Sequence, residues 1–497
     1  MGLRRRPNAA GDHAPVHHAS TTAERPDVRH ATQVPLPARG PAAERGARVL
    51  IIDKAPQLGG TLHISTGQIA GAGTVFQARA GIEDSPEAHY EDAMRINEGT
   101  ADPRVLRLWT REAGPTLNWL ADRGFEIAPG LPVRGLNHEH YKVERYLWGP
   151  QDGVSILNVL LDELDPHLAS GQVEVLLDTG VVELIQDRAG AVTGVVVEDE
   201  AGSRQDLHAA RVLLASGGCA ANPRMYEDLH GLPLYAGAAY PFSHGDGLML
   251  GLAAGGHLHG GDKYLGLFGT VMADASLPAG LSQHWQLDPG RRQLRELFVN
   301  AHGKRFVRED HPSVHHREMA LDEQPGHRFW VVFDQRALDG GPSLVADMDA
   351  SRMQALFDSH PMFFSAPTVA SLAVRAGIHP LELQRSVDDY NARVAADEPD
   401  AFGREHRPAT LETAPFYAVQ CQGWTLVSFA GLVVDDALRV LRADGSAAPD
   451  LYAAGEVLGA GATSGKAYVG GALVTPALAF GRLLGMRVGA GGSPRLG

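Results

Sequence analysis

Cysteine is scarce in this chain, with only Cys219 and Cys421 among 497 residues. Two cysteines cannot supply a disulfide framework, a CxxC redox pair, a CxxCH haem-attachment motif or a cysteine-based zinc site. Their scarcity argues against the small disulfide-stapled secreted proteins and favours a reducing, cytoplasmic setting.

Long apolar runs and an excess of basic residues are also lacking. No run approaches the roughly 18 apolar residues of a membrane-spanning helix, so we expect no transmembrane segment. The chain has 44 basic and 59 acidic residues, which gives a formal net charge of −15. That charge argues against nucleic acid as a partner. A small molecule is the expected partner, and an anionic one would need a local basic pocket.

Glycine, in contrast, is abundant, with 58 residues. In a chain without repeats, this indicates many tight turns and close backbone approaches, which nucleotide sites need. Residues 1–41 hold several prolines and no lasting apolar period, so we expect them to be disordered or aberrant. From residue 42 the pattern predicts a helix end, a glycine stop at Gly46 and a buried strand over 48–53. Further helices are expected over 86–97, 103–124, 150–170 and 471–486, with a hairpin turn at 187–190.

The segment VLIIDKAPQLGGT (49–61) combines the first buried strand with a glycine turn. An acidic residue at the end of a parallel strand can accept hydrogen bonds from a ribose, and Asp53 has that position. Gly59 and Gly60 would let the backbone approach a diphosphate, to which Thr61 can donate. The alternative is an ordinary strand and turn with a solvated aspartate.

Two later segments repeat the order of buried strand and glycine turn: LLASGGCAAN (213–222) and LYAAGEVLGAGATSGKAYVGGALVTPALAFGRLLG (451–485). For the first, a common turn is the alternative. In the second, Glu456 is placed to bind a ribose or ribityl hydroxyl. A helix that begins near Gly471 would direct the positive end of its dipole toward an anionic group.

A fourth segment, FVNAHGKRFVRED (298–310), brings Arg305, Arg308, Glu309 and Asp310 close together in sequence. Arginine and glutamate so near each other can bind a carboxylate or relay a proton. The alternative is a surface hairpin with a solvated ion pair.

Together these segments, with STGQIAGAGT (65–74) and GDGLMLGLAAGG (245–256), resemble the fumarate reductase/succinate dehydrogenase flavoprotein family. Ketosteroid dehydrogenases and tricarballylate dehydrogenases are among its relatives. The resemblance implies an α/β fold in which a Rossmann-like, glutathione-reductase-type FAD-binding domain carries an inserted α+β capping domain. The expected divisions are 42–270 and 416–497 for the FAD-binding domain and 271–415 for the cap.

The resemblance also implies non-covalent FAD and a hydride transfer at an activated C–C or C=C bond of a small organic substrate. A separate electron donor or acceptor would complete the reaction. The implied FAD contacts are Asp53, Lys54, Gly59, Gly60, Thr61, Ser65, Gly67, Ala215, Gly217, Gly218, Asp246, Glu456, Gly471 and Leu473.

One departure from the family concerns its first strand and Gly-x-Gly-x-x-Gly loop, which cradle the pyrophosphate. The loop should fall near residues 30–35, where this chain reads HATQVP. The first strand and glycine loop are therefore expected to be missing. The competing hypothesis is a truncated or frame-damaged flavoprotein homologue without cofactor or activity.

A second departure concerns the substrate. Fumarate reductases carry a histidine and an arginine in the late part of the chain, where Val427 and Tyr468 stand here. A dicarboxylate clamp is thus in doubt, and a tyrosine would suit a less charged substrate such as an enone. The candidate catalytic residues are Tyr468, Arg308, Glu309, Arg336 and Lys466.

The segment NHEHYKVERYLWGP (137–150) is expected to contribute to the same pocket. Its candidates are His138, His140, Tyr141, Arg145 and Trp148. His138 and His140 alternate as a metal pair on a strand would, but no third ligand is evident, so no metal is expected.

Overall fold

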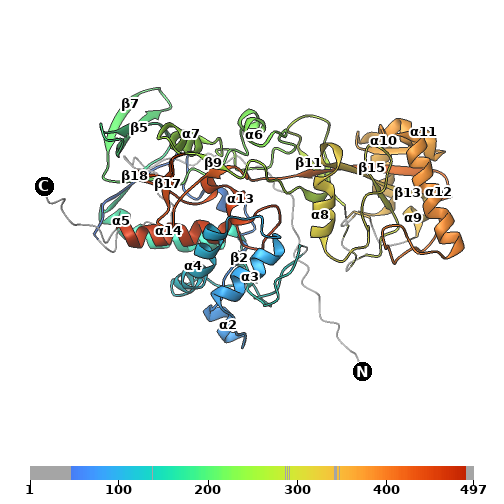
Figure 1. Cartoon of the computed structure of the whole chain (residues 1–497), viewed down its shortest axis with the longest axis horizontal. Helices are drawn as coiled ribbons and strands as arrows, with labels where there is room; N and C mark the ends of the chain where they lie inside the picture. The colour runs from blue at the N-terminus through green and yellow to red at the C-terminus, as the bar shows by residue number, and fades with distance from the viewer. Residues whose placement is uncertain are drawn as a thin grey trace.

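Two lobes lie side by side along the long axis of the molecule (Figure 1). The computed structural model describes residues 46–488, apart from residues 137, 286, 288, 290, 291, 341–343, 346 and 347. The predicted aberrant N-terminus, residues 1–41, lies outside the described residues, and so does the stretch where the family would have its first strand and glycine loop.

The first lobe is built from short sheets and the helices packed on them. Its strands are β1 (Val49–Ile52), β2 (Ile69–Ala70), β3 (Tyr146–Leu147), β4 (Val173–Leu176), β5 (Thr179–Gln186), β6 (Val192–Asp199), β7 (Arg204–His208), β8 (Val212–Leu214), β9 (Leu258–His259), β16 (Gly431–Leu432), β17 (Arg439–Leu441) and β18 (Ala447–Ala453). Its helices are η1 (Gly60–His63), α2 (Val75–Arg79), α3 (Pro86–Ile96), α4 (Pro103–Ala121), α5 (Gly153–Ala169), α6 (Pro223–His230), α7 (Asp246–Ala253), η3 (Glu456–Leu458), α13 (Ala460–Thr463) and α14 (Val474–Val488).

Two parallel strand pairs set the position of the glycine turns. β1 pairs with β4, with Val49 opposite Val173. β18 pairs with β8, with Leu451 opposite Val212. No strand among the described residues joins the two pairs. Parallel strands end at the same edge of a sheet, which is where α/β proteins bind nucleotides.

The helices and hairpin expected from apolar spacing are confirmed. α3, α4, α5 and α14 occupy the predicted ranges to within a few residues. Ser85 and Asp102 cap α3 and α4 through their side chains, and each helix has proline at its first position. Both features stabilise a helix N-terminus. β5 and β6 form the antiparallel hairpin.

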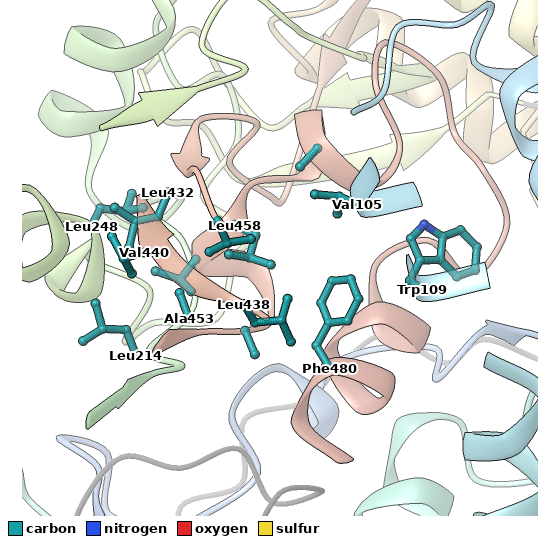
Figure 2. Packing of buried hydrophobic residues seen from close by; sticks show 14 of the residues in the cluster. Val105, Trp109, Leu214, Leu248, Leu432, Leu438, Val440, Ala453, Leu458 and Phe480 are labelled. Carbon is teal, nitrogen blue, oxygen red and sulfur yellow. The ribbon is translucent and has the colours of Figure 1, made fainter. Parts of the chain in front are cut away.

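The core of the first lobe lies between helices α4 and α14 and the sheet β17–β18–β8 (Figure 2). Trp109 of α4 and Phe480 of α14 are fully buried there. Val440 and Ala453 of the sheet belong to the same cluster. Burial of these apolar side chains, rather than helix propensity, holds the strand ends in place.

The second lobe is a six-stranded antiparallel sheet with helices packed around it. Its strands are β10 (Leu267–Met272), β11 (Leu281–His284), β12 (Leu297–Val299), β13 (Arg328–Asp334), β14 (Phe363–Ala366) and β15 (Phe416–Trp424). Its helices are α8 (Val314–Asp322), η2 (Pro325–His327), α9 (Gln335–Asp339), α10 (Ala350–Ser359), α11 (Val369–Ala376) and α12 (Pro380–Ala396). This sheet begins before and ends after the predicted domain limits of 271 and 415. None of the described helices in either lobe is long and apolar enough to cross a membrane.

Leu106→Ala in α4 tests the importance of the first-lobe core. Leu106 is fully buried, so its truncation should lower the free energy of unfolding by about 2–5 kcal/mol. Leu381→Ala in the first turn of α12 is the matched control, because Leu381 is 67% exposed. Urea unfolding followed by circular dichroism should separate the two variants; equal midpoints would contradict the assignment of this core.

Candidate functional site

A cavity of about 420 Å³ lies where the two parallel strand pairs end. Asp53 follows β1, Ala215 follows β8 and Gly455 follows β18, and all three line the cavity. Its volume falls within the usual range of ligand pockets. All the predicted FAD contacts except Gly67 and Gly218 line it.

Gly67 and Gly218 instead act behind the cavity wall. A Cβ on Gly67 would lie 2.5 Å from the backbone nitrogen of Gly153, so Gly67 lets its loop pack on the start of α5. A Cβ on Gly218 would lie 1.8 Å from Oγ of Ser428. The Gly218 backbone N–H donates to the Glu456 carboxylate. Both glycines therefore have a packing role in the structure, and their contacts with FAD stay predictions.

One end of the cavity is polar and rich in backbone. The N–H of Ala55 donates to Oδ1 of Asp53 at 3.0 Å, which fixes that carboxylate at the end of β1. Lys54 forms an ion pair with Asp246, the first residue of α7. Gly59 has φ +120°, a conformation that side chains rarely adopt, and a Cβ there would meet Leu157 at 2.8 Å.

Glu456 lies in the cavity wall and is held by two neighbouring segments. The Ser428 N–H donates to its Oε1 at 3.1 Å, and the Gly218 N–H also donates to the carboxylate. Burial raises the pKa of Glu456 to about 7, against the lowering effect of these hydrogen bonds. A hydroxyl donor in the cavity would therefore find an acceptor that is already oriented.

The N-terminal end of α14 closes another side of the cavity. Gly471, at φ +80°, precedes this helix, and a Cβ there would lie 2.5 Å from the backbone nitrogen of Ala70. Leu473, Val474 and Ala477 line the cavity around the first turn. The positive end of the helix dipole favours negative charge in the cavity, while the Thr475 N–H donates to the Gly471 carbonyl oxygen at 3.0 Å and Pro476 has no N–H.

Tyr468 is far from Asp53 in the sequence. It lines the same cavity, together with Leu426 and Val427. Its hydroxyl donates to Oε1 of Gln68 at 2.8 Å and lies 3.3 Å from the hydroxyl of Tyr146. Burial raises the pKa of the Tyr468 phenol, so the group keeps its proton at neutral pH.

Gln68 also separates the main cavity from a second one of about 90 Å³. Gln68 and Tyr468 line both cavities, and His138, Tyr141 and Tyr146 line the smaller one. This second cavity has room for a few water molecules. Sequence reasoning missed Gln68 and Tyr146 as site residues, although Gln68 lies within the motif STGQIAGAGT.

The structure places Arg308 and Glu309 away from both cavities. Arg308 pairs with Asp310 at 2.9 Å and with Glu405 at 3.0 Å. Glu309 is fully buried in the second lobe, where Arg305 pairs with it at 2.7 Å. These contacts make the FVNAHGKRFVRED segment a structural ion-pair network, and they give no support to a catalytic role.

Arg336 and Lys466 do not line either cavity. The exposed Arg336 donates to Oγ1 of Thr413 at 3.2 Å. The backbone N–H of Lys466 donates to Oγ1 of Thr100 at 2.9 Å. Its ammonium group lowers the pKa of Asp322, against the larger raising effect of burial. Of the five predicted catalytic residues, the cavity brings in Tyr468 alone.

The segment around residues 138–148 is divided in the same way. Arg145 is fully buried and pairs with Asp84 at 2.7 Å and Asp92 at 3.2 Å, so it belongs to the core and not to the pocket. His140 contacts the carbonyl oxygen of Leu136 at 2.8 Å, and Trp148 lines neither cavity. Among the described residues, no group of three or more potential metal-binding side chains occurs.

The chain is similar to known proteins in both sequence and fold. Residues 41–473 match the family model "FAD binding domain". A fumarate reductase (cytochrome) of Shewanella frigidimarina is 26% identical over 454 residues, which cover 89% of this chain and 73% of that protein. A vinyl phenol reductase of Lactiplantibacillus plantarum is 27% identical over 438 residues, 83% of this chain and 85% of that protein. The solved structure of 3-ketosteroid-Δ4-(5α)-dehydrogenase from Rhodococcus jostii RHA1 is 22% identical and superposes with a TM-score of 0.66, covering 91% of this chain and 94% of that one.

The chain belongs to the FAD-binding-domain family. The predicted resemblance to the fumarate reductase/succinate dehydrogenase flavoproteins is confirmed, as is FAD as the cofactor. The protein is an FAD-dependent oxidoreductase that acts on CH–CH groups of small organic molecules. The competing hypothesis of a homologue without cofactor or activity is not favoured. The cavity fits FAD because its wall combines three features: a carboxylate at the end of a strand, glycines packed too closely for a Cβ, and the N-terminus of a helix.

Glu456→Gln tests the buried acceptor through the stability of the FAD-free protein. The pKa of Glu456 rises from 4.5 to about 7 on folding, so its contribution is most favourable below pH 4.5 and is lost as the pH rises toward 7. Across that window the wild type should lose about 3 kcal/mol that the variant does not lose. Urea unfolding at both ends of the window measures the difference, and parallel curves for the two proteins would contradict it.

Proposed function

We propose that the protein reduces an uncharged, conjugated C=C bond, such as that of an α,β-unsaturated ketone, with Tyr468 as the proton donor. The observation that carries this proposal is the half-buried Tyr468 side chain, which lines both cavities. The other four predicted catalytic residues line neither cavity, so Tyr468 is the predicted proton-transfer residue that reaches the pocket.

The charge of the pocket supports an uncharged substrate. Among the described residues that line the main cavity, Lys54 is the one basic side chain, and Asp246 neutralises it. Leu426 and Val427 make the surface near Tyr468 apolar. A dicarboxylate would lose its hydration here without gaining a cationic partner, which is costly. The similarity to a vinyl phenol reductase agrees with a substrate of this kind.

Bound FAD supplies the two-electron chemistry, a hydride given to or taken from carbon. The residues of the chain supply orientation and the proton. Glu456, Asp53 and the first turn of α14 would hold the cofactor. Tyr468 donates its phenolic proton to complete reduction of the double bond. Because burial raises the pKa of this phenol, its protonated form, which a proton donor needs, dominates at neutral pH.

The second lobe supports the proposed capping domain of residues 271–415. Its helix α8 lies at the boundary with the first lobe (Figure 1), and Glu318 of α8 contacts His138 of the first lobe at 3.2 Å. A cap so placed would exclude water from the substrate. The missing first strand and the cytoplasmic location also remain proposals. With two cysteines and no haem motif, the protein would exchange electrons with a separate partner.

Tyr468→Phe tests the proton donor. The variant should retain FAD but reduce an enone such as 2-cyclohexenone about 10²–10⁴-fold more slowly in kcat, because it lacks the acidic hydroxyl. Tyr240→Phe is the matched control, since Tyr240 also lines the cavity but near Asp53, and should keep its activity. Steady-state kinetics with a reduced viologen dye as electron donor and the flavin spectrum provide the measurements.

Fumarate serves as the competing substrate in the same assay. A wild type that reduces fumarate faster than every uncharged alkene tested would overturn the proposed substrate class. An active Tyr468→Phe with full FAD content would overturn the proposed donor.

A further inference from the structure

The ring of Tyr468 rests on a histidine from another segment. The His138 and Tyr468 rings stack with their centroids 4.0 Å apart and their planes 24° apart. His138 lies in the loop before β3 and lines the smaller cavity. A stacked neighbour restricts the rotation of a tyrosine ring and therefore fixes where its hydroxyl points.

A buried carboxylate holds His138 in turn. Nδ1 of His138 lies 3.2 Å from Oε2 of Glu318, and Glu318 is 1% exposed. Its second oxygen, Oε1, has no hydrogen-bond partner among the residues that the structure describes. A buried carboxylate with one oxygen that lacks a hydrogen bond lowers the stability of the folded protein. Such a group is therefore expected to have a functional role. Glu318 comes from α8 of the second lobe, so the contact joins the two lobes at the proton donor.

We propose that His138 and Glu318 are positioning residues for Tyr468: the His138 ring orients the phenol, and the buried Glu318 carboxylate holds that ring and places a fixed negative charge near the phenol. This inference rests on the proposed function of Tyr468. Neither residue is placed to exchange a proton with the substrate directly, because the contact between His138 and Tyr468 is a ring stack.

The charged and titratable neighbours are consistent with this assignment. Tyr146, Tyr141 and Glu318 surround Tyr468, and the Glu318 charge adds to burial in raising the pKa of Tyr468. Around His138 and Glu318 lie His284 and His315, and burial lowers the pKa of both histidines. His315 also senses Glu139 and Glu98. Near neutral pH, Glu318 thus faces no strong cation among these groups.

Glu318→Gln tests the charge. The FAD-loaded variant should keep its kcat near pH 7, while the high-pH limb of its kcat profile moves to lower pH by about one unit. The matched control is Asp322→Asn, one turn later on α8, because Asp322 faces His327 and Lys466 instead of Tyr468. Its profile should match that of the wild type. An unshifted Glu318→Gln profile, or an equal shift in Asp322→Asn, would overturn the role of the charge.

His138→Ala and His138→Phe test the stack. Loss of the ring in His138→Ala should lower kcat about tenfold at an unchanged FAD content, and His138→Phe, which restores an aromatic surface, should recover most of it. Equal activity of His138→Ala and the wild type would overturn the positioning role, as would failure of His138→Phe to recover. An active Tyr468→Phe would overturn the proposed function and this inference together. If Tyr468→Phe is inactive but the His138 and Glu318 variants have the kcat and the pH profile of the wild type, this inference alone is overturned.

Discussion

Parallel pairing of short strands is the constraint on which the site depends. β1 with β4 and β8 with β18 bring residues from three distant parts of the sequence to one edge. Asp53, Ala215 and Ala454 meet there because each follows the last residue of its strand. Loop residues then need little more than small size, since the backbone itself forms much of the wall. The abundance of glycine follows from that requirement.

The helix–sheet core makes this arrangement rigid. α14 serves two purposes, because Phe480 packs in the core while the first turn lines the cavity. Thr475 links α14 to β2, since its hydroxyl accepts a hydrogen bond from the N–H of Ala70 at 2.9 Å. A helix that is fixed by its apolar face can present its polar N-terminus to a ligand without reorganisation.

Local patterns were sufficient to predict helices α3, α4, α5 and α14 and most of the glycine and acidic residues that line the cavity. The apolar spacing of 103–121 and the capping Asp102 determine α4 largely by themselves. Asp53, Gly59, Glu456 and Gly471 were found because strand, acidic residue and glycine turn are adjacent in sequence. Their shared position in the wall of one cavity is a consequence of that local order. The first strand and glycine loop of the family could not be located by the same means, since residues 30–35 carry no glycine.

The sequence could not show which charged candidates line the cavity and which form structural ion pairs, because burial and the choice of partner depend on contacts between distant segments. Arg145 and Arg308 read alike in a sequence, yet one is enclosed by Asp84 and Asp92 and the other lies partly exposed beside Asp310. A buried arginine needs a carboxylate partner, and that partner comes from wherever the fold brings one. Proximity of Arg and Glu in sequence therefore predicts an ion pair better than it predicts catalysis.

The same reasoning explains why the surroundings of Tyr468 were found only in part. Gln68, His138 and Glu318 come from three segments. His138 was a candidate from its segment, whereas Gln68 and Glu318 were not found from sequence. Each has a different effect on the phenol: Gln68 accepts its proton in a hydrogen bond, His138 covers one face of its ring, and Glu318 adds negative charge. All three effects favour a neutral, oriented O–H over a phenolate. An acid arranged in this way needs no cation in the pocket, and the apolar surface of Leu426 and Val427 beside it is consistent with a substrate that brings no charge of its own.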